Sequence, residues 1–177
     1  DYVRASFISF LVSLTDELLR LHNYNLATAI TSGLNNSSLS RLKKTWPLVP
    51  SATHKALAAH SALLDNNYAT LRAALRVAPM PNTPFLGCIL TDLVYLNEMK
   101  SSHDGLVHFH KYQRVSDVIF DIQSRQRSVY PPLPASVTVG MLNFLRKSLT
   151  RSLSRDDIHA QSLAIETHAR LPRRARR

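Results

Sequence analysis

Val94 and Glu98 are the two residues of this sequence whose types and spacing most directly suggest a function. Residues four apart lie on one face of an α-helix, so the pair would place an apolar side chain one turn before a carboxylate. We expect the pair near the C-terminal end of a helix, where the helix dipole disfavours a negative charge. Glu98 is therefore electrostatically disfavoured unless it has a function, although on spacing alone an ordinary helix end is the commoner explanation.

Other arrangements that carry out chemistry have little support in the sequence. There is no Gly-x-Ser-x-Gly motif and no phosphate-binding glycine loop. The single cysteine, Cys88, lies in an apolar segment, which favours burial over nucleophilic chemistry. His108 and His110 are two apart, and side chains at that spacing on a helix point in different directions. We therefore expect no metal site and no cofactor.

Positive charge is the feature of the composition that bears on partners. The chain has 22 Lys+Arg, 12 Asp+Glu and a net charge of +10, with no apolar run long enough to span a membrane. We expect a cytoplasmic protein, and nucleic acid, anionic lipid and an acidic protein surface all fit this charge. Trp46 beside Lys43 and Lys44 could stack on nucleic acid, but one aromatic offers little stacking surface. A tryptophan that anchors a helix end is the favoured interpretation.

The Val94 and Glu98 pair belongs to a predicted antiparallel helical hairpin at about residues 84–127. Thr83 is a favourable N-cap and Pro84 suits the first position of a helix. The first helix is apolar on nearly every side, which indicates either burial or a binding partner. A short polar loop at residues 99–105 then leads to a second helix at residues 106–126. Two long helices joined in this way form an αα-hairpin.

The remaining sequence is predicted to be helical throughout, so the expected fold class is all-α. Strand patterns are nearly absent: there are four glycines, no Asn-Gly turn and no sustained alternation of apolar and polar residues. We expect one domain over residues 1–169 and a basic, disordered tail at residues 170–177. Further helices are predicted at residues 3–21, 26–34, 51–64, around 68–75, at 137–149 and from a capping box at 154–157 to about 168.

Several motifs occur in one order along the chain. They are Asn23-Tyr24-Asn25, the block from Ser32 to Trp46, Asn67-Tyr68, Pro84-Phe85-Leu86-Gly87 with Leu90-Thr91-Asp92, Phe109-x-Lys111, Ile122-Gln123 and Ser162 to Glu166. Together they resemble the catalytic domain of Ras-type guanine-nucleotide exchange factors. The resemblance extends from about residue 3 to residue 170. The family's domain has further helices ahead of this point, so the chain resembles its C-terminal two-thirds.

The resemblance implies a fold, a partner and roles for single residues. The fold would be an irregular helical bowl with a protruding hairpin that enters between the two switch segments of a Ras-family GTPase. Val94 would take the place of the GTPase's Mg²⁺, and Glu98 would approach the α-phosphate site. Nucleotide would then dissociate faster without any covalent chemistry. The other residues implied to bind the GTPase are Asn35, Asn67, Thr91 and Arg114 through polar contacts, and Phe85 and Thr28 along an apolar cleft.

Two alternatives to an exchange factor remain at this stage. Without the preceding helices, the chain could be a GTPase-binding or scaffold module that exchanges nucleotide poorly. A basic helical protein that binds nucleic acid is the least favoured reading, and it predicts a steep dependence on salt. For an exchange factor, we expect the tightest binding to the nucleotide-free GTPase, recruitment to the inner face of a membrane and a weak lipid contact through the arginine-rich tail.

Overall fold

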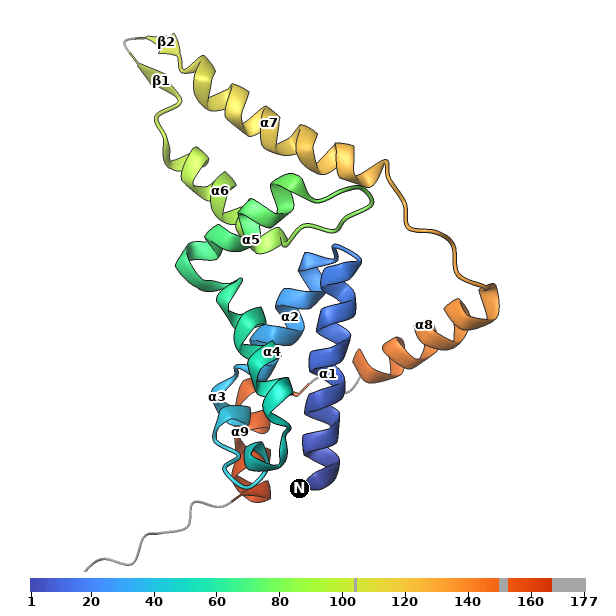
Figure 1. Cartoon of the computed structure of the whole chain (residues 1–177). Helices are drawn as coiled ribbons and strands as arrows, with labels where there is room; N and C mark the ends of the chain where they lie inside the picture. Colours follow the sequence, from blue (N-terminus) through green and yellow to red (C-terminus); the bar gives the residue numbers. More distant parts are fainter. Residues whose placement is uncertain (104, 150–152, 167–177) are drawn as a thin grey trace, which may run out of the picture.

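The computed structural model describes residues 1–103, 105–149 and 153–166, and most of them lie in helices (Figure 1). This confirms the expected all-α class. Besides a 3₁₀ turn at Trp46–Leu48 and the two-residue strands β1 (Ser102–His103) and β2 (Leu106–Val107), the elements are α1 (Tyr2–Arg20), α2 (Tyr24–Leu34), α3 (Ser37–Ser40), α4 (Ser51–Ala62), α5 (Asp65–Val77), α6 (Leu86–Glu98), α7 (Phe109–Gln126), α8 (Ala135–Leu149) and α9 (Arg155–Ile165).

The main core lies where α1 packs against α2 and α4. Apolar side chains recur along α1 at three- and four-residue steps, which puts Ala5, Ile8 and Val12 on one buried face. Trp46 packs against this core, and its indole N–H donates to the Leu39 carbonyl at 2.8 Å. Trp46 is thus a structural anchor, which agrees with the interpretation favoured from the sequence.

A second cluster connects the main core to α6. It consists of the buried residues Tyr24, Leu71 and Cys88, with partly buried apolar side chains from α5 and the segment before α6 around them. Cys88 is 5% exposed, which confirms its predicted burial, and this burial raises the pKa of its thiol. The cluster gives α6 a fixed base on α2 and α5.

The start of α6 differs from the sequence prediction. The helix begins at Leu86, so Thr83 is not its N-cap and Pro84 is not its first residue. The Thr83 amide donates to the His22 carbonyl at 3.0 Å, and the Thr83 carbonyl accepts from the Tyr24 amide at 2.9 Å. These bonds belong to a bridge between Asn23 and Thr83 that holds the segment extended. Thr83 therefore joins the α1–α2 connection to the base of α6.

The connection between α6 and α7 also differs from the expected polar loop. β1 and β2 pair antiparallel, with Ser102 opposite Val107 and His103 opposite Leu106. Gly105 turns the chain with a φ of +77°, a conformation that glycine adopts without steric strain. Residues 106 and 107 are therefore strand and not helix, and α7 begins at Phe109. In Figure 1 this small ladder forms the tip of the α6–α7 hairpin.

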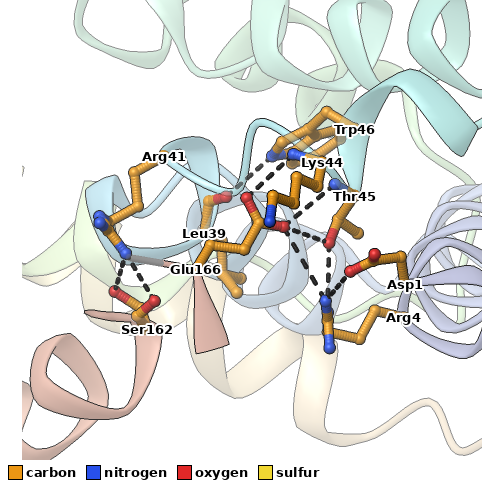
Figure 2. A network of polar contacts seen from close by, with 9 residues as sticks. All are labelled: Asp1, Arg4, Leu39, Arg41, Lys44, Thr45, Trp46, Ser162 and Glu166. Atoms are coloured by element: carbon orange, nitrogen blue, oxygen red, sulfur yellow. Dashed lines mark hydrogen bonds and ion pairs between the residues drawn. The ribbon is translucent and has the colours of Figure 1, made fainter. Parts of the chain in front are cut away.

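The last described helix, α9, is attached to the opposite end of the molecule (Figure 1). Its N-terminus has the predicted capping box, in which Ser154 and Asp157 satisfy each other's backbone amides. Arg41 donates to the Ser162 carbonyl at 2.5 Å and to its hydroxyl at 3.3 Å (Figure 2). The predicted basic tail lies outside the described residues.

Glu166 completes this attachment by accepting hydrogen bonds from the loop that follows α3 (Figure 2). Its carboxylate accepts from the Lys44 amide at 2.9 Å, the Thr45 amide at 3.1 Å and the Thr45 hydroxyl at 2.9 Å. Burial alone would raise the pKa of Glu166. The hydrogen bonds, with Arg4 nearby, outweigh burial and leave that pKa below its usual value.

Candidate functional site

One face of α6 presents a line of exposed side chains at four-residue steps. Leu86, Leu90 and Val94 are 50%, 60% and 57% exposed, and Glu98 follows at the end of the helix. Large apolar side chains are normally removed from water when they lie in a row, so this row is typical of a surface that binds a partner. We call Leu86, Leu90, Val94 and Glu98 the α6 stripe. The structure therefore brings Val94 and Glu98 together as the sequence predicted.

The other side of α6 is held against the molecule. Cys88, Ile89 and Leu96 are the buried residues of this helix. The guanidinium of Arg72 in α5 contacts the Asp92 carboxylate at 2.5 Å and donates to the Cys88 carbonyl at 3.3 Å. The hydrogen bond with Asp92 is the main reason that the pKa of Arg72 is raised. These contacts fix which face of α6 points outward.

Lys111 in α7 is a residue of the site whose role was not predicted from the sequence. Its side chain is 5% exposed, and its ammonium donates to the Asn97 carbonyl at 3.0 Å, the Met99 carbonyl at 2.7 Å and the Ser101 hydroxyl at 3.0 Å. It thus binds the C-terminal end of α6, next to Glu98. The sequence signal that could have indicated this role is the predicted C-terminal end of the helix, because a helix end has unpaired carbonyls and attracts a cation.

A groove of about 560 Å³ separates the outer parts of α6 and α7. Arg114 and Asp117 of α7 line it opposite Asp92 and Tyr95 of α6. Arg114 is exposed, so it lies on the hairpin within reach of a partner that contacts α6. Thr91 is half-buried and its hydroxyl donates to the Gly87 carbonyl at 2.8 Å, so that hydroxyl is already engaged within the helix.

The two asparagines predicted to contact the GTPase are both exposed, and both lie where the helical backbone is interrupted. Asn35 follows α2, and its side-chain amide donates to the Ser61 hydroxyl at 2.9 Å. Asn67 lies in a kink within α5, where three consecutive residues from Asn66 to Tyr68 have a positive φ. Asparagine tolerates this conformation better than most residues. Both amides are accessible to a partner.

The structure does not place Phe85 and Thr28 along one open cleft. Phe85 is half-buried, and its ring lies 5.2 Å from the ring of Tyr68, centre to centre. Thr28 is only 4% exposed and borders a small space of about 10 Å³ between α1, α2, α4 and α5. Leu71 borders that space and also belongs to the cluster around Phe85. Thr28 therefore lies beneath the surface of the molecule.

Comparison with known proteins identifies the family. The model of the RasGEF domain matches residues 2–113, which is more than half of the chain. The chain belongs to the RasGEF domain family. The match confirms the resemblance found in the sequence, and it contains the whole α6 stripe together with Lys111. Arg114 directly follows the matched region.

Full-length relatives of this RasGEF domain are much longer than the chain. It is 36% identical over 167 residues to mouse Ras-specific guanine nucleotide-releasing factor 1, covering 92% of this chain and 13% of the relative. It is 30% identical over 166 residues to Ras guanine nucleotide exchange factor C of Dictyostelium discoideum, covering 92% of this chain and 11% of that relative. It is 35% identical over 174 residues to mouse Ras-specific guanine nucleotide-releasing factor 2, covering 96% of this chain and 14% of that relative. The chain thus spans less than a sixth of each of these relatives.

Neither a cluster of metal ligands nor a membrane-spanning helix occurs in the part of the RasGEF chain that the structure describes. That part contains no group of three or more His, Cys, Asp or Glu side chains placed to hold a metal ion. The rings of His108 and His110 lie 6.4 Å apart, and a ring nitrogen of His108 contacts the Lys100 carbonyl at 3.1 Å. None of its helices is long and apolar enough to cross a membrane.

Proposed function

We propose that this RasGEF domain accelerates the release of GDP from a Ras-family GTPase. The observation that carries the proposal is the α6 stripe, in which three exposed apolar residues lead to a carboxylate at the end of the helix. Family membership and the names of the relatives point to the same activity. In this proposal the α6–α7 hairpin enters between the two switch segments of the GTPase.

The stripe would act on the two charges that hold the nucleotide. Val94 places an apolar side chain where the GTPase holds Mg²⁺, and Glu98 brings a carboxylate toward the α-phosphate site. Loss of a cation and approach of an anion both weaken the attraction for phosphate. No bond is made or broken. By thermodynamic linkage, the nucleotide weakens the binding of this chain by the same factor, so the nucleotide-free GTPase is bound most tightly.

The remaining contacts would place the hairpin on the GTPase. Asn35 and Asn67 present exposed amides, and Arg114 presents a guanidinium along the groove between α6 and α7. Thr91 would contribute only as far as its half-buried side chain allows. Phe85 would supply an apolar contact at the base of α6. We propose that Thr28 supports this contact through Leu71, which borders the same small space as Thr28 and belongs to the cluster around Phe85.

The charge of the chain fits the same partner. A net charge of +10 favours approach to an acidic protein surface and speeds association. We further propose that the protein acts in the cytoplasm at the inner face of a membrane, where its GTPase resides. The basic residues 170–177 would add a weak contact with anionic lipids. Nucleic acid is not a partner in this proposal.

Release of a fluorescent GDP analogue tests the proposed function. Ras-, Rap- and Ral-type GTPases are loaded with the analogue, and its release is followed with and without the chain at micromolar concentration. We expect faster release from at least one of them. Unchanged release together with tight binding to the nucleotide-free form would replace exchange by a binding-only function. Neither acceleration nor binding would contradict both.

A further inference from the structure

The ammonium of Lys111 holds the backbone on both sides of Glu98. It donates to the carbonyls of Asn97 and Met99, the residues directly before and after Glu98. Its third hydrogen bond goes to the Ser101 hydroxyl. A lysine ammonium has three N–H donors, so all three are satisfied. A single side chain of α7 therefore binds the backbone on both sides of the last residue of α6.

The burial of this ammonium shows that the arrangement is specific. A charged group removed from water carries a large desolvation penalty unless polar partners replace the water. Lys111 is 5% exposed and finds those partners at the C-terminal end of α6, where unpaired carbonyls and the helix dipole attract a cation. Glu98 itself is exposed. The positive charge thus holds the backbone of α6 while the carboxylate remains directed to solvent.

We propose that Lys111 is a positioning residue for nucleotide exchange, which holds the last turn of α6 so that Glu98 meets the GTPase in one fixed place. The inference rests on the proposed exchange function. Lys111 lies behind the α6 stripe and would not touch nucleotide. Substitution of Lys111 would leave all four residues of the α6 stripe unchanged. It would, however, release the end of α6 that carries the Glu98 carboxylate. A displacement of about 1 Å in a functional group can cost on the order of 100-fold in rate.

A double-mutant cycle on the full chain tests the positioning role. GDP release is measured with the wild type, Lys111→Met, Glu98→Ala and the double variant, on a GTPase that the wild type accelerates. We expect Lys111→Met to slow release by about tenfold or more, within the range that such misplacement allows. We also expect the double variant to match Glu98→Ala, because Lys111 acts through Glu98. A full additional loss in the double variant, or no loss in Lys111→Met, would overturn the inference.

Two further variants separate positioning from charge and from folding. Lys100→Met removes an exposed positive charge from the same end of the hairpin, and we expect release to stay within twofold of the wild type. If it slows release as much as Lys111→Met does, the effect is one of charge and the inference fails. Lys111→Gln is too short to reach both carbonyls and should show the same defect as Lys111→Met, and a Gln variant with wild-type rates would also overturn the inference.

Amide hydrogen exchange tests the inference without a GTPase. In Lys111→Met, we expect faster exchange at residues 97–101 and unchanged protection in α1, whose core is distant from this site. Unchanged protection at residues 97–101 would show that Lys111 does not hold the helix end. Because this measurement needs no exchange activity, it distinguishes failure of the positioning role from failure of the proposed function. The latter appears as a wild-type chain that accelerates no GTPase.

Discussion

Single buried charged residues join separate elements of this chain through backbone groups. Glu166 accepts from the amides of Lys44 and Thr45, more than 120 residues away, and Lys111 donates to carbonyls at the end of α6. In each case a charged group is buried together with the backbone groups that satisfy it, which avoids an unpaired buried charge. These two residues therefore hold α9 and the hairpin in place.

The depressed pKa of Glu166 gives a prediction for stability against pH. A carboxylate whose folded pKa lies below its unfolded value of about 4.3 stabilises the fold above that value, and the contribution disappears as pH falls through the folded pKa. We expect Glu166→Gln to be less stable than the wild type at pH 7, and the difference to shrink below about pH 4. Urea unfolding at several pH values measures it.

The control for Glu166 is the same substitution at an exposed position. Glu98→Gln should change the free energy of unfolding by less than about 0.5 kcal/mol, as surface substitutions usually do. A difference between Glu166→Gln and the wild type that stays constant from pH 7 to pH 3 would show that the ionised carboxylate is not what attaches α9.

At the scale of elements, periodic helices could be predicted from the sequence and their connections could not. The apolar spacing of α1 is a local property, and the helix was predicted to within one residue at each end. The start of α6 was missed because Thr83 bonds to His22 and Tyr24, which are about 60 residues earlier. β1 and β2 were missed because a two-residue ladder has no periodic pattern.

The candidate site likewise contains features that could be predicted from the sequence and features that could not. Val94 and Glu98 could be paired from helical spacing alone, because both lie on one element. The roles of Arg72 and Lys111 depend on which helices pack together, which local sequence does not reveal. The same holds for Thr28, whose burial follows from the meeting of four helices. Spacing within a helix was therefore predictive, whereas contacts between helices were not.

The contact between Arg72 and Asp92 attaches α6 to α5, and this attachment can be tested by substitution. We expect Arg72→Leu to slow GDP release several-fold, because α6 loses its polar attachment to α5. Its cost in stability should be no more than about 1 kcal/mol, since both side chains are partly exposed. Arg76→Leu, one turn further along α5 and exposed, is the matched control. Equal release rates for the two variants would show that the Arg72 contact does not position α6.

The net positive charge of the whole chain predicts how association depends on salt. Long-range attraction between a chain of net charge +10 and an acidic partner is screened as ionic strength rises. We expect association with the nucleotide-free GTPase to slow several-fold between 50 and 200 mM salt, roughly the range over which electrostatic steering fades, while dissociation changes little. Stopped-flow binding measures both rates. An association rate that is independent of salt would contradict this role for the charge.

The proposed function depends above all on the exposed α6 stripe, and Glu98→Ala tests it most directly. The substitution removes a carboxylate at an exposed helix end, so we expect an unchanged circular dichroism spectrum and little change in stability. Release of a fluorescent GDP analogue from a responsive GTPase should fall by about 100-fold or more, the range typical of losing one electrostatic contact that acts in the transition state. Wild-type release rates for a folded Glu98→Ala variant would contradict the proposal that this carboxylate drives nucleotide from the GTPase.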